Sequence, residues 1–167
     1  MPGPSDYWST FEQRLTDLGA QPVLIGALAA LEYRATPRLT TDVDFLVSSL
    51  RGVADAFRAD GYDVREMAEP GSDPYLVFIR GHGISVDALL VETPYQAEAH
   101  GRAVNGLLTV EDVIVHKLIA WREKDQDDIA SILAAGPPLD LEYIARWAEE
   151  WSVQPRWTEA TRRWAHE

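Results

Sequence analysis

The stretch RLTTDVDFLV, residues 38–47, decides which fold we expect. Four of its last five residues are apolar, which is typical of a β-strand that enters a hydrophobic core. Asp42 and Asp44 stand two apart in this strand, so their side chains share one face at a spacing of about 6.6 Å. Carboxylates this close repel each other unless a cation lies between them, and oxygen-rich sites of this kind suit Mg²⁺. An exposed polar strand end is the alternative, because so short a motif also arises by chance.

A short strand and a glycine turn lie upstream, in LIGALAA, residues 24–30. Gly26 lets the backbone approach a ligand closely, and Ala27 begins a helix of small residues. Backbone N–H groups at such a strand-to-helix turn can hold a phosphate. An ordinary tight turn is the other interpretation of this stretch.

A third carboxylate follows far along the chain. Asp87 lies within the apolar strand ISVDALL, residues 84–90, where burying a carboxylate without a partner is costly. Two-metal phosphoryl transfer needs about three such ligands. Asp87 is therefore the residue that we expect to join Asp42 and Asp44.

Strand and helix patterns alternate over the first two-thirds of the chain, which predicts an α/β (α+β) fold: a mixed β-sheet flanked by helices, with a helical C-terminal part. Strands are expected at 22–26, 41–48, 62–67, 75–81 and 83–92, with a weak one at 106–109. Helices are expected at 8–19, 27–35, 51–61, 110–121, 125–136, 140–151 and 157–166. We expect a core over residues 1–135 and a helical appendage, residues 136–167, packed on the same domain.

Charge and composition limit the classes of function. The chain has 167 residues and a net charge of −12, which weighs against a protein that coats nucleic acid, since such binding rests on neutralising phosphates. It has no cysteine, and so neither a disulfide framework nor a thiolate metal site. No apolar run has membrane-spanning length, and the first residues, MPGPSDYW, lack the features of a signal peptide. We expect a cytoplasmic protein with no membrane partner.

The strand, the glycine turn, the Asp-x-Asp strand and the later in-strand aspartate together resemble the nucleotidyltransferase superfamily, which shares its fold with DNA polymerase β. The chain looks most like small bacterial and archaeal members, including toxins of the AbiEii kind, in which GGLA and PRxTxDIDL are typical. The matching stretches here are GALA, residues 26–29, and PRLTTDVDF, residues 37–45, and the likeness covers roughly residues 20–135. One departure is Ala27, which offers a phosphate only its N–H, where a serine would add a hydroxyl.

The resemblance implies an Mg²⁺-dependent enzyme that moves a nucleoside monophosphate from an NTP to an acceptor. It implies two metal ions, with Mn²⁺ as a substitute for Mg²⁺. Asp42 and Asp44 would hold the ion on the nucleotide side, and Asp87 would complete the second site and help to deprotonate the acceptor. The acceptor stays open among RNA or tRNA, a protein and a small molecule, and a toxin of this kind would have an antitoxin partner.

Three charged residues fall on apolar helix faces. Lys117 lies inside the apolar stripe of one expected helix, and Asp125 and Asp128 share the apolar side of the next. A lysine on such a stripe either reaches solvent or meets an anion, so a structural ion pair or a helix cap is one interpretation. The other follows from the resemblance, because HKLIAWREKDQDDI, residues 116–129, is similar to a family segment hKLhAxRxKDxxDI. It implies that Lys117 holds nucleotide phosphates and that the two aspartates orient it.

Arg38 and Thr40 precede the aspartate pair closely enough to contact a phosphate or to brace the turn. They complete the nucleotide-binding set that we expect: Gly26, Ala27, Arg38, Thr40, Lys117, Asp125 and Asp128.

Other chemistry-bearing residues are given smaller roles. Arg122 and Lys124 are interpreted as solvated surface residues that add positive potential to the rim of the site, and His116 as a residue of a helix surface. Trp147 and Trp151 are one helical turn apart, which favours core packing over a base-stacking platform or a protein-partner surface.

Two further functions stay open. Ala27 and the aromatic C-terminal part are also compatible with a non-catalytic binding or regulatory protein on a degenerate nucleotidyltransferase scaffold. A metal-dependent phosphohydrolase that uses the same carboxylates is the third hypothesis.

Overall fold

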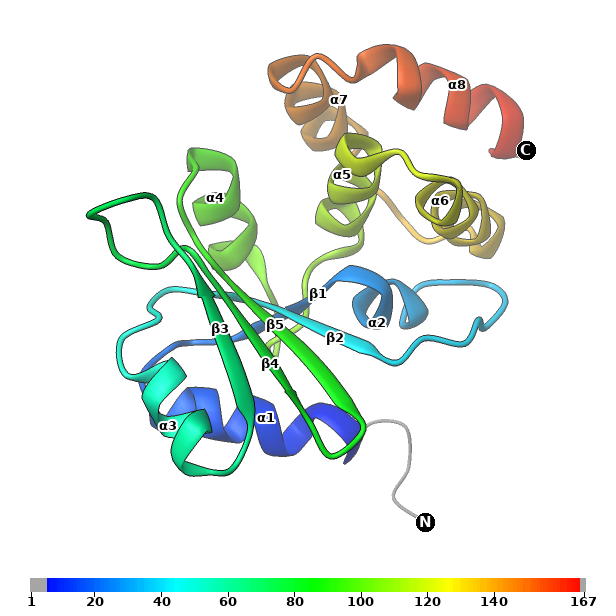
Figure 1. Ribbon diagram of the computed structural model, residues 1–167. Helices are drawn as coiled ribbons and strands as arrows, with labels where there is room; N and C mark the ends of the chain where they lie inside the picture. The colour runs from blue at the N-terminus through cyan, green and yellow to red at the C-terminus, as the bar shows by residue number, and fades with distance from the viewer. Residues whose placement is uncertain (1–5, 166–167) are drawn as a thin grey trace.

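A five-stranded mixed sheet organises the chain in the computed structural model, which describes residues 6–165 (Figure 1). The strands are β1 (Val23–Ile25), β2 (Asp42–Val47), β3 (Asp63–Met67), β4 (Leu76–Gly81) and β5 (Ile84–Leu90). They lie in the order β1-β2-β5-β4-β3, and only β2 and β5 pair in parallel. The α/β fold with a mixed sheet is therefore confirmed.

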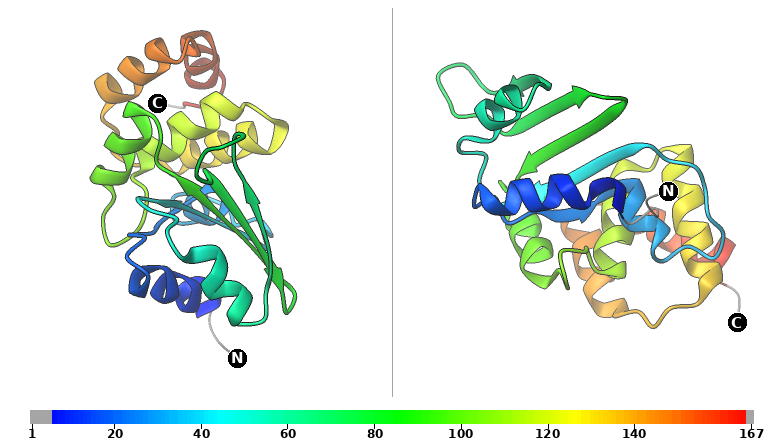
Figure 2. Two further views of the ribbon diagram at one scale, coloured as in Figure 1. Left: turned by 60° about the vertical axis from the view of Figure 1, so that its left-hand side comes forward. Right: turned by 90° about the horizontal axis from the view of Figure 1, so that it is seen from below.

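The helices divide between the two sides of the sheet (Figures 1 and 2). They are α1 (Asp6–Asp17), α2 (Gly26–Leu31), α3 (Val53–Ala59), α4 (Pro94–Arg102), α5 (Val110–Ala120), α6 (Glu123–Ala135), α7 (Leu141–Glu150) and α8 (Gln154–Trp164). Helices α1 and α3 lie side by side on one side of the sheet, while α5 to α8 gather on the other.

Strand β2 shows why the sheet has one closed and one open face. Val43, Phe45 and Val47 alternate along it and are completely buried, as the period of two requires. Burying each such side chain contributes about 1.5–3 kcal/mol. The intervening residues Asp42 and Asp44 therefore face the opposite side, where Asp42 is exposed and Asp44 is half-buried.

A buried carboxylate ties three helices together. Asp112 of α5 is completely buried and accepts hydrogen bonds from the hydroxyls of Tyr95 on α4 (3.1 Å), Tyr143 on α7 (2.5 Å) and Thr109 (2.8 Å). A buried charge of this kind is tolerated because its lone pairs are satisfied. The cluster fixes α4 and α7 against α5.

The C-terminal helices share the buried core of the rest of the chain. Ile144, Ala148 and Trp157 belong to the same cluster of buried residues as the sheet. Arg156 of α8 donates hydrogen bonds of 2.8 and 2.9 Å to the carbonyl oxygens of Leu118 and Ile119. These carbonyls lie in the last turn of α5, where helices leave acceptors unsatisfied.

The element boundaries differ from the expected ones in a few places. Helix α4 was not expected, residues 106–109 form only two isolated bridges, both through Leu107, and α8 begins at Gln154. Residues 1–5 and 166–167 lie outside the described part, including most of the stretch MPGPSDYW and the last residue of the expected terminal helix. None of the described helices combines the length and the apolar character needed to cross a membrane.

Candidate active site

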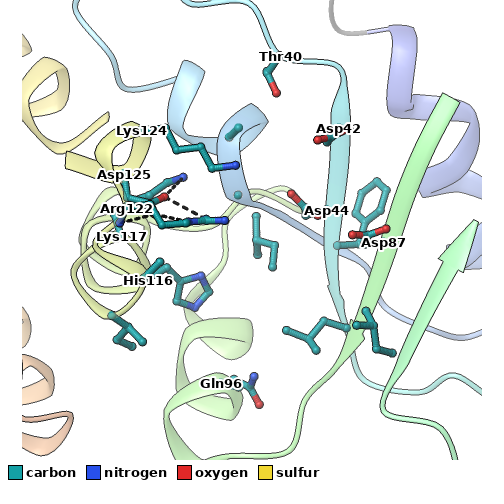
Figure 3. A pocket seen from close by; sticks show the side chains of 18 of the residues that line it. Thr40, Asp42, Asp44, Asp87, Gln96, His116, Lys117, Arg122, Lys124 and Asp125 are labelled. Carbon is teal, nitrogen blue, oxygen red and sulfur yellow. Dashed lines mark hydrogen bonds and ion pairs between the residues drawn. The ribbon is translucent and has the colours of Figure 1, made fainter. Parts of the chain in front are cut away.

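A cleft of about 760 Å³ lies between the open face of the sheet and helices α2, α4, α5 and α6 (Figure 3). Strands β2 and β5 contribute one wall, which carries the three aspartates. Helices α5 and α6 contribute the opposite wall, which carries basic side chains. The cleft thus sets an acidic surface against a basic one.

The parallel pairing of β2 with β5 brings the three expected carboxylates together. Asp44 and Asp87 are directly paired across the two strands, and Asp42 pairs with Ser85. Neighbouring strands lie about 4.8 Å apart, so the Cα atoms of Asp44 and Asp87 are separated by about one strand spacing. All three aspartates line the cleft and lie on the same wall in Figure 3.

The surroundings of Asp44 disfavour its ionised form. Burial, together with the charges of Asp87 and Asp42, raises the pKa of Asp44 to about 6, against the opposing effect of Lys117 and Lys124. A carboxylate whose ionised form is this unfavourable gains from a nearby cation. The acidic wall therefore favours binding of positive charge.

Asp87 already has a cationic neighbour. The Nη1 atom of Arg80 on β4 lies 2.7 Å from its Oδ1 atom, but the same Nη1 donates to the carbonyl oxygens of Ile79 (3.1 Å) and Val86 (3.0 Å). Oδ1 of Asp87 is buried and accepts no hydrogen bond from the described residues. The contact is therefore an ion pair without hydrogen-bond geometry, which leaves the oxygen with an unused acceptor site.

The donor set fits magnesium in its chemistry. Three carboxylates share one wall, one of them has a raised pKa, and another has a buried oxygen without a hydrogen bond. Hard oxygen donors of this kind are the usual ligands of Mg²⁺. Among residues 6–165, however, no three His, Cys, Asp or Glu side chains are arranged to hold one ion as they stand. A metal-bound state thus requires a side-chain rearrangement, in which Asp87 leaves Arg80.

Gly26 begins α2 at the edge of the cleft, beside Asp44. Its φ angle is +70°, a left-handed conformation that favours glycine. A Cβ atom at this position would lie 2.4 Å from Oδ2 of Asp44. The glycine is therefore required both by the backbone conformation and by the close approach of the aspartate.

We expect Gly26→Ala to lower the free energy of unfolding by more than the about 1–2 kcal/mol that left-handed alanine costs, because the methyl group also displaces Asp44. Gly52→Ala is the matched control: its φ angle is +72° and its added Cβ would meet nothing within 4 Å. Urea unfolding of both variants measures the difference. Equal losses in the two variants would contradict the close packing of Gly26 on Asp44.

Lys117 lies between the two aspartates of α6, as its place on the apolar stripe suggested. Its ammonium is 3.1 Å from Oδ1 of Asp125 and 2.9 Å from Oδ2 of Asp128, and both carboxylates are completely buried. Lys117 and Asp125 line the cleft, whereas Asp128 is not one of its lining residues. Both carboxylates are therefore placed to orient the lysine.

Asp128 is the centre of a buried cluster of cations. Arg38 binds it through Nε and Nη2, both at 2.8 Å, and Nη1 of Arg34 lies 2.6 Å from its Oδ1. Burial alone would raise the pKa of Asp128, but the hydrogen bonds from Arg38 and Lys117 outweigh it and hold the pKa at about 2. Arg38 lines the cleft but is committed to Asp128, so its expected contact with a phosphate stays a prediction.

Two further basic residues line the cleft and have fewer ion-pair partners. Arg122 is paired with Asp125 (Nε to Oδ2, 2.7 Å), yet 60% of its side chain is exposed. Lys124 is exposed, forms no ion pair among the described residues and extends across the cleft toward Asp44 (Figure 3). Both line the cleft, so the interpretation of these residues as solvated surface alone is incomplete. Thr40 and Ala27 also line the cleft.

The wall that α4 and the end of α7 contribute was not predicted from the sequence. Tyr95, Gln96 and Trp151 line the cleft, and so does His116, which is half-buried and contacts the ring of Tyr95. The interpretation of His116 as a surface residue was wrong, because α4 and α7 pack beside its helix. Thr93 and Gln96 form a capping box at the start of α4, with Pro94 in the first turn, and this TPxQ pattern was the available signal.

No protein-family model and no curated protein matches the chain. Several solved structures do, among them two from Helicobacter pylori. A candidate nucleotidyltransferase is 14% identical, with a TM-score of 0.52, and the match covers 94% of this chain and 79% of that one. The JHP933 protein is 16% identical, with the same TM-score, and the match covers 94% of this chain and 75% of that one. The subtype resembling AbiEii stays a prediction. This chain therefore shares the fold of both structures, one of which is a candidate nucleotidyltransferase.

Proposed function

We propose that the protein is an Mg²⁺-dependent nucleotidyltransferase, which moves a nucleoside monophosphate from an NTP to an acceptor. One observation carries the proposal: the pairing of β2 with β5 sets Asp44 beside Asp87, on a wall that faces basic residues across the cleft. Carboxylates for metal ions opposite cations for phosphates are what nucleotidyl transfer requires. The fold shared with a candidate nucleotidyltransferase supports the same reading.

In this proposal Asp42 and Asp44 hold an Mg²⁺ ion on the nucleotide side, and Asp87 completes a second site. When bound, the ions stabilise the negative charge on the attacking and leaving oxygens. The acceptor hydroxyl oxygen forms a bond to the α-phosphorus while the bond to pyrophosphate breaks, and Asp87 helps to remove the hydroxyl proton. Arg80 must then release Asp87, since the two side chains form an ion pair at 2.7 Å.

The triphosphate is held by the opposite wall and by the glycine turn. Lys124 and Arg122 supply exposed positive charge, and Lys117 supplies a buried ammonium oriented by its two aspartates. Gly26 and Ala27 offer backbone N–H groups beside Asp44. The acceptor class, whether RNA, protein or small molecule, and a role as the toxin of a toxin-antitoxin pair belong to the same hypothesis.

A second candidate function is a non-catalytic nucleotide-binding or regulatory protein on this scaffold. The ion pair of Asp87 with Arg80 and the absence of a ready three-ligand arrangement among the described residues favour it, as does Ala27 in the glycine turn. In that case the cleft binds an NTP but transfers nothing.

Incubation of the purified protein with each α-labelled NTP, Mg²⁺ and total cell lysate tests the proposal. We expect a labelled acceptor with one or more NTPs, and no label when EDTA removes the metal. Calorimetric heat of NTP binding without any labelled product would support the binding protein instead. Release of pyrophosphate without a labelled acceptor would support the metal-dependent phosphohydrolase.

A further inference from the structure

An aromatic corner lines the helical side of the cleft. Tyr95, His116 and Trp151 form it, from α4, α5 and the residue that follows α7. The rings of His116 and Trp151 both contact Tyr95 edge-on, with centroids 5.4 and 6.2 Å away. Tyr95 itself is buried, so the other two rings form the accessible surface of the corner.

Trp151 is the most exposed tryptophan of the C-terminal helices. Its exposed fraction is 39%, whereas Trp157 on the neighbouring helix is 8% exposed. An apolar ring of this size in contact with water is unfavourable unless something covers it. Trp151 lines a cleft rather than a convex surface. A flat group of a ligand therefore fits over its ring better than the surface of a second protein does.

Gln96 adds a donor of fixed direction beside this corner (Figure 3). Its Oε1 atom accepts hydrogen bonds from the backbone N–H groups of Glu92 (2.8 Å) and Thr93 (3.0 Å). The amide oxygen is therefore committed to the start of α4. The amide nitrogen makes no hydrogen bond with the described residues, so Gln96 presents only an N–H₂ donor to the cleft.

His116 remains uncharged under physiological conditions. Burial lowers the pKa of its imidazole to about 4, so at neutral pH one ring nitrogen donates and the other accepts. The aromatic corner therefore offers a flat surface and neutral polar atoms, whereas the charged groups lie on the other walls. This division matches a nucleotide, with its neutral, planar base and its charged phosphates.

We propose that the aromatic corner is the base subsite, in which Trp151 stacks on the nucleobase of the NTP and Gln96 donates to an acceptor atom on the base edge. The inference rests on the proposed function, because it takes the triphosphate to lie between the aspartates and the basic wall. A cleft of about 760 Å³ is in the size range of pockets for ligands of this kind. Stacking of a base on an aromatic side chain contributes about 1–3 kcal/mol.

Binding of NTPs and of tripolyphosphate, which has no base, separates this subsite from the phosphate site. In calorimetry with Mg²⁺, we expect Trp151→Ala to weaken binding of at least one NTP about tenfold, which corresponds to about 1.4 kcal/mol. Its affinity for tripolyphosphate should stay unchanged. Trp151→Phe should keep most of the NTP affinity, because a smaller ring still stacks. Trp164→Ala, which removes a partly buried tryptophan outside the cleft, is the matched control and should leave both affinities unchanged.

Gln96→Glu tests the directed donor. The carboxylate keeps an oxygen for the two backbone N–H groups of the capping box, and replaces the outward N–H₂ with an acceptor. We expect it to weaken NTP binding several-fold more than tripolyphosphate binding. The effect on tripolyphosphate measures the general repulsion from the added charge.

The outcomes distinguish a failure of the proposed function from a failure of the base subsite alone. If the wild-type protein binds neither NTP nor tripolyphosphate, the proposed function fails, and this inference fails with it. If it binds NTP no more tightly than tripolyphosphate, or if Trp151→Ala weakens both ligands equally, the phosphate site stands and the base subsite is wrong.

Discussion

Asp44→Asn is expected to abolish nucleotidyl transfer and at the same time to stabilise the metal-free protein at neutral pH. Loss of one metal ligand should lower the rate by about a thousandfold or more, since each 1.36 kcal/mol of transition-state stabilisation is tenfold in rate. The stability gain arises because burial and the charges of Asp87 and Asp42 disfavour the ionised Asp44. Removing that charge should raise the free energy of unfolding by about 1–3 kcal/mol, or several degrees in melting temperature.

The pH dependence of this effect has a definite sign. Folding raises the pKa of Asp44 from 3.8 to about 6, so the folded state binds the proton more tightly than the unfolded state. The wild-type protein without metal should therefore lose stability as the pH rises from about 4 to 6, and Asp44→Asn should lack this part of the loss. Thermal melts in EDTA across this range measure it, with Asp73→Asn in an exposed loop as the control. Full transfer activity in Asp44→Asn would end the metal-site proposal.

Asp128→Asn is expected to give the largest loss of stability, about 3–5 kcal/mol, because it leaves Lys117, Arg34 and Arg38 without their shared buried counter-charge. An asparagine has nearly the same shape, so the loss reports the charge rather than a cavity. Urea unfolding measures the change in the free energy of unfolding. A loss of this size is a large part of the free energy of unfolding of a typical domain, which is about 5–15 kcal/mol.

Asp127→Asn provides the control on the adjacent residue. The side chain of Asp127 is 61% exposed and, among residues 6–165, pairs only with Nη2 of Arg34, at 3.0 Å, so its loss should cost less than about 1 kcal/mol. Folding lowers the pKa of Asp128 to about 2, so its contribution is present above pH 4 and is lost as the pH falls toward 2. The difference between Asp128→Asn and the wild type should shrink over this interval. Equal effects of the two substitutions at pH 7 would contradict a buried role for Asp128.

Local patterns in the sequence were sufficient to place Asp42 and Asp44 on one face of β2. The alternation in β2 determines which face Asp42 and Asp44 occupy, because burying Val43 and Phe45 fixes the opposite face. Asp87 could be predicted as a site residue because a carboxylate within an apolar strand is costly to bury without a partner. The pairing that sets it beside Asp44, however, is a contact between strands 43 residues apart, and only the resemblance suggested it.

The aromatic corner could not be foreseen in the same way. His116 lies beside the apolar stripe of α5, and only the packing of α4 and α7 against that helix turns its position into part of a cleft. Helix α4 carries few apolar residues, so periodicity did not indicate it, and its TPxQ start was overlooked. Trp151 fits a helical turn with Trp147, which favoured core packing, but the helix ends just before it and leaves its ring accessible. The sequence did not indicate the ion pair of Arg80 with Asp87, because the two residues become neighbours only when β4 pairs with β5.

The hydrogen bonds of Arg156 with the end of α5 bear on how the protein matures on the ribosome. All three aspartates have been synthesised once residue 87 is made, but the helix that carries Lys117 and His116 lacks the hydrogen bonds at its end until residue 156 is made. At a synthesis rate of about 5–20 residues per second, this delay lasts several seconds. The helical wall of the cleft therefore gains its last described backbone contacts well after the strands that carry the aspartates have been synthesised.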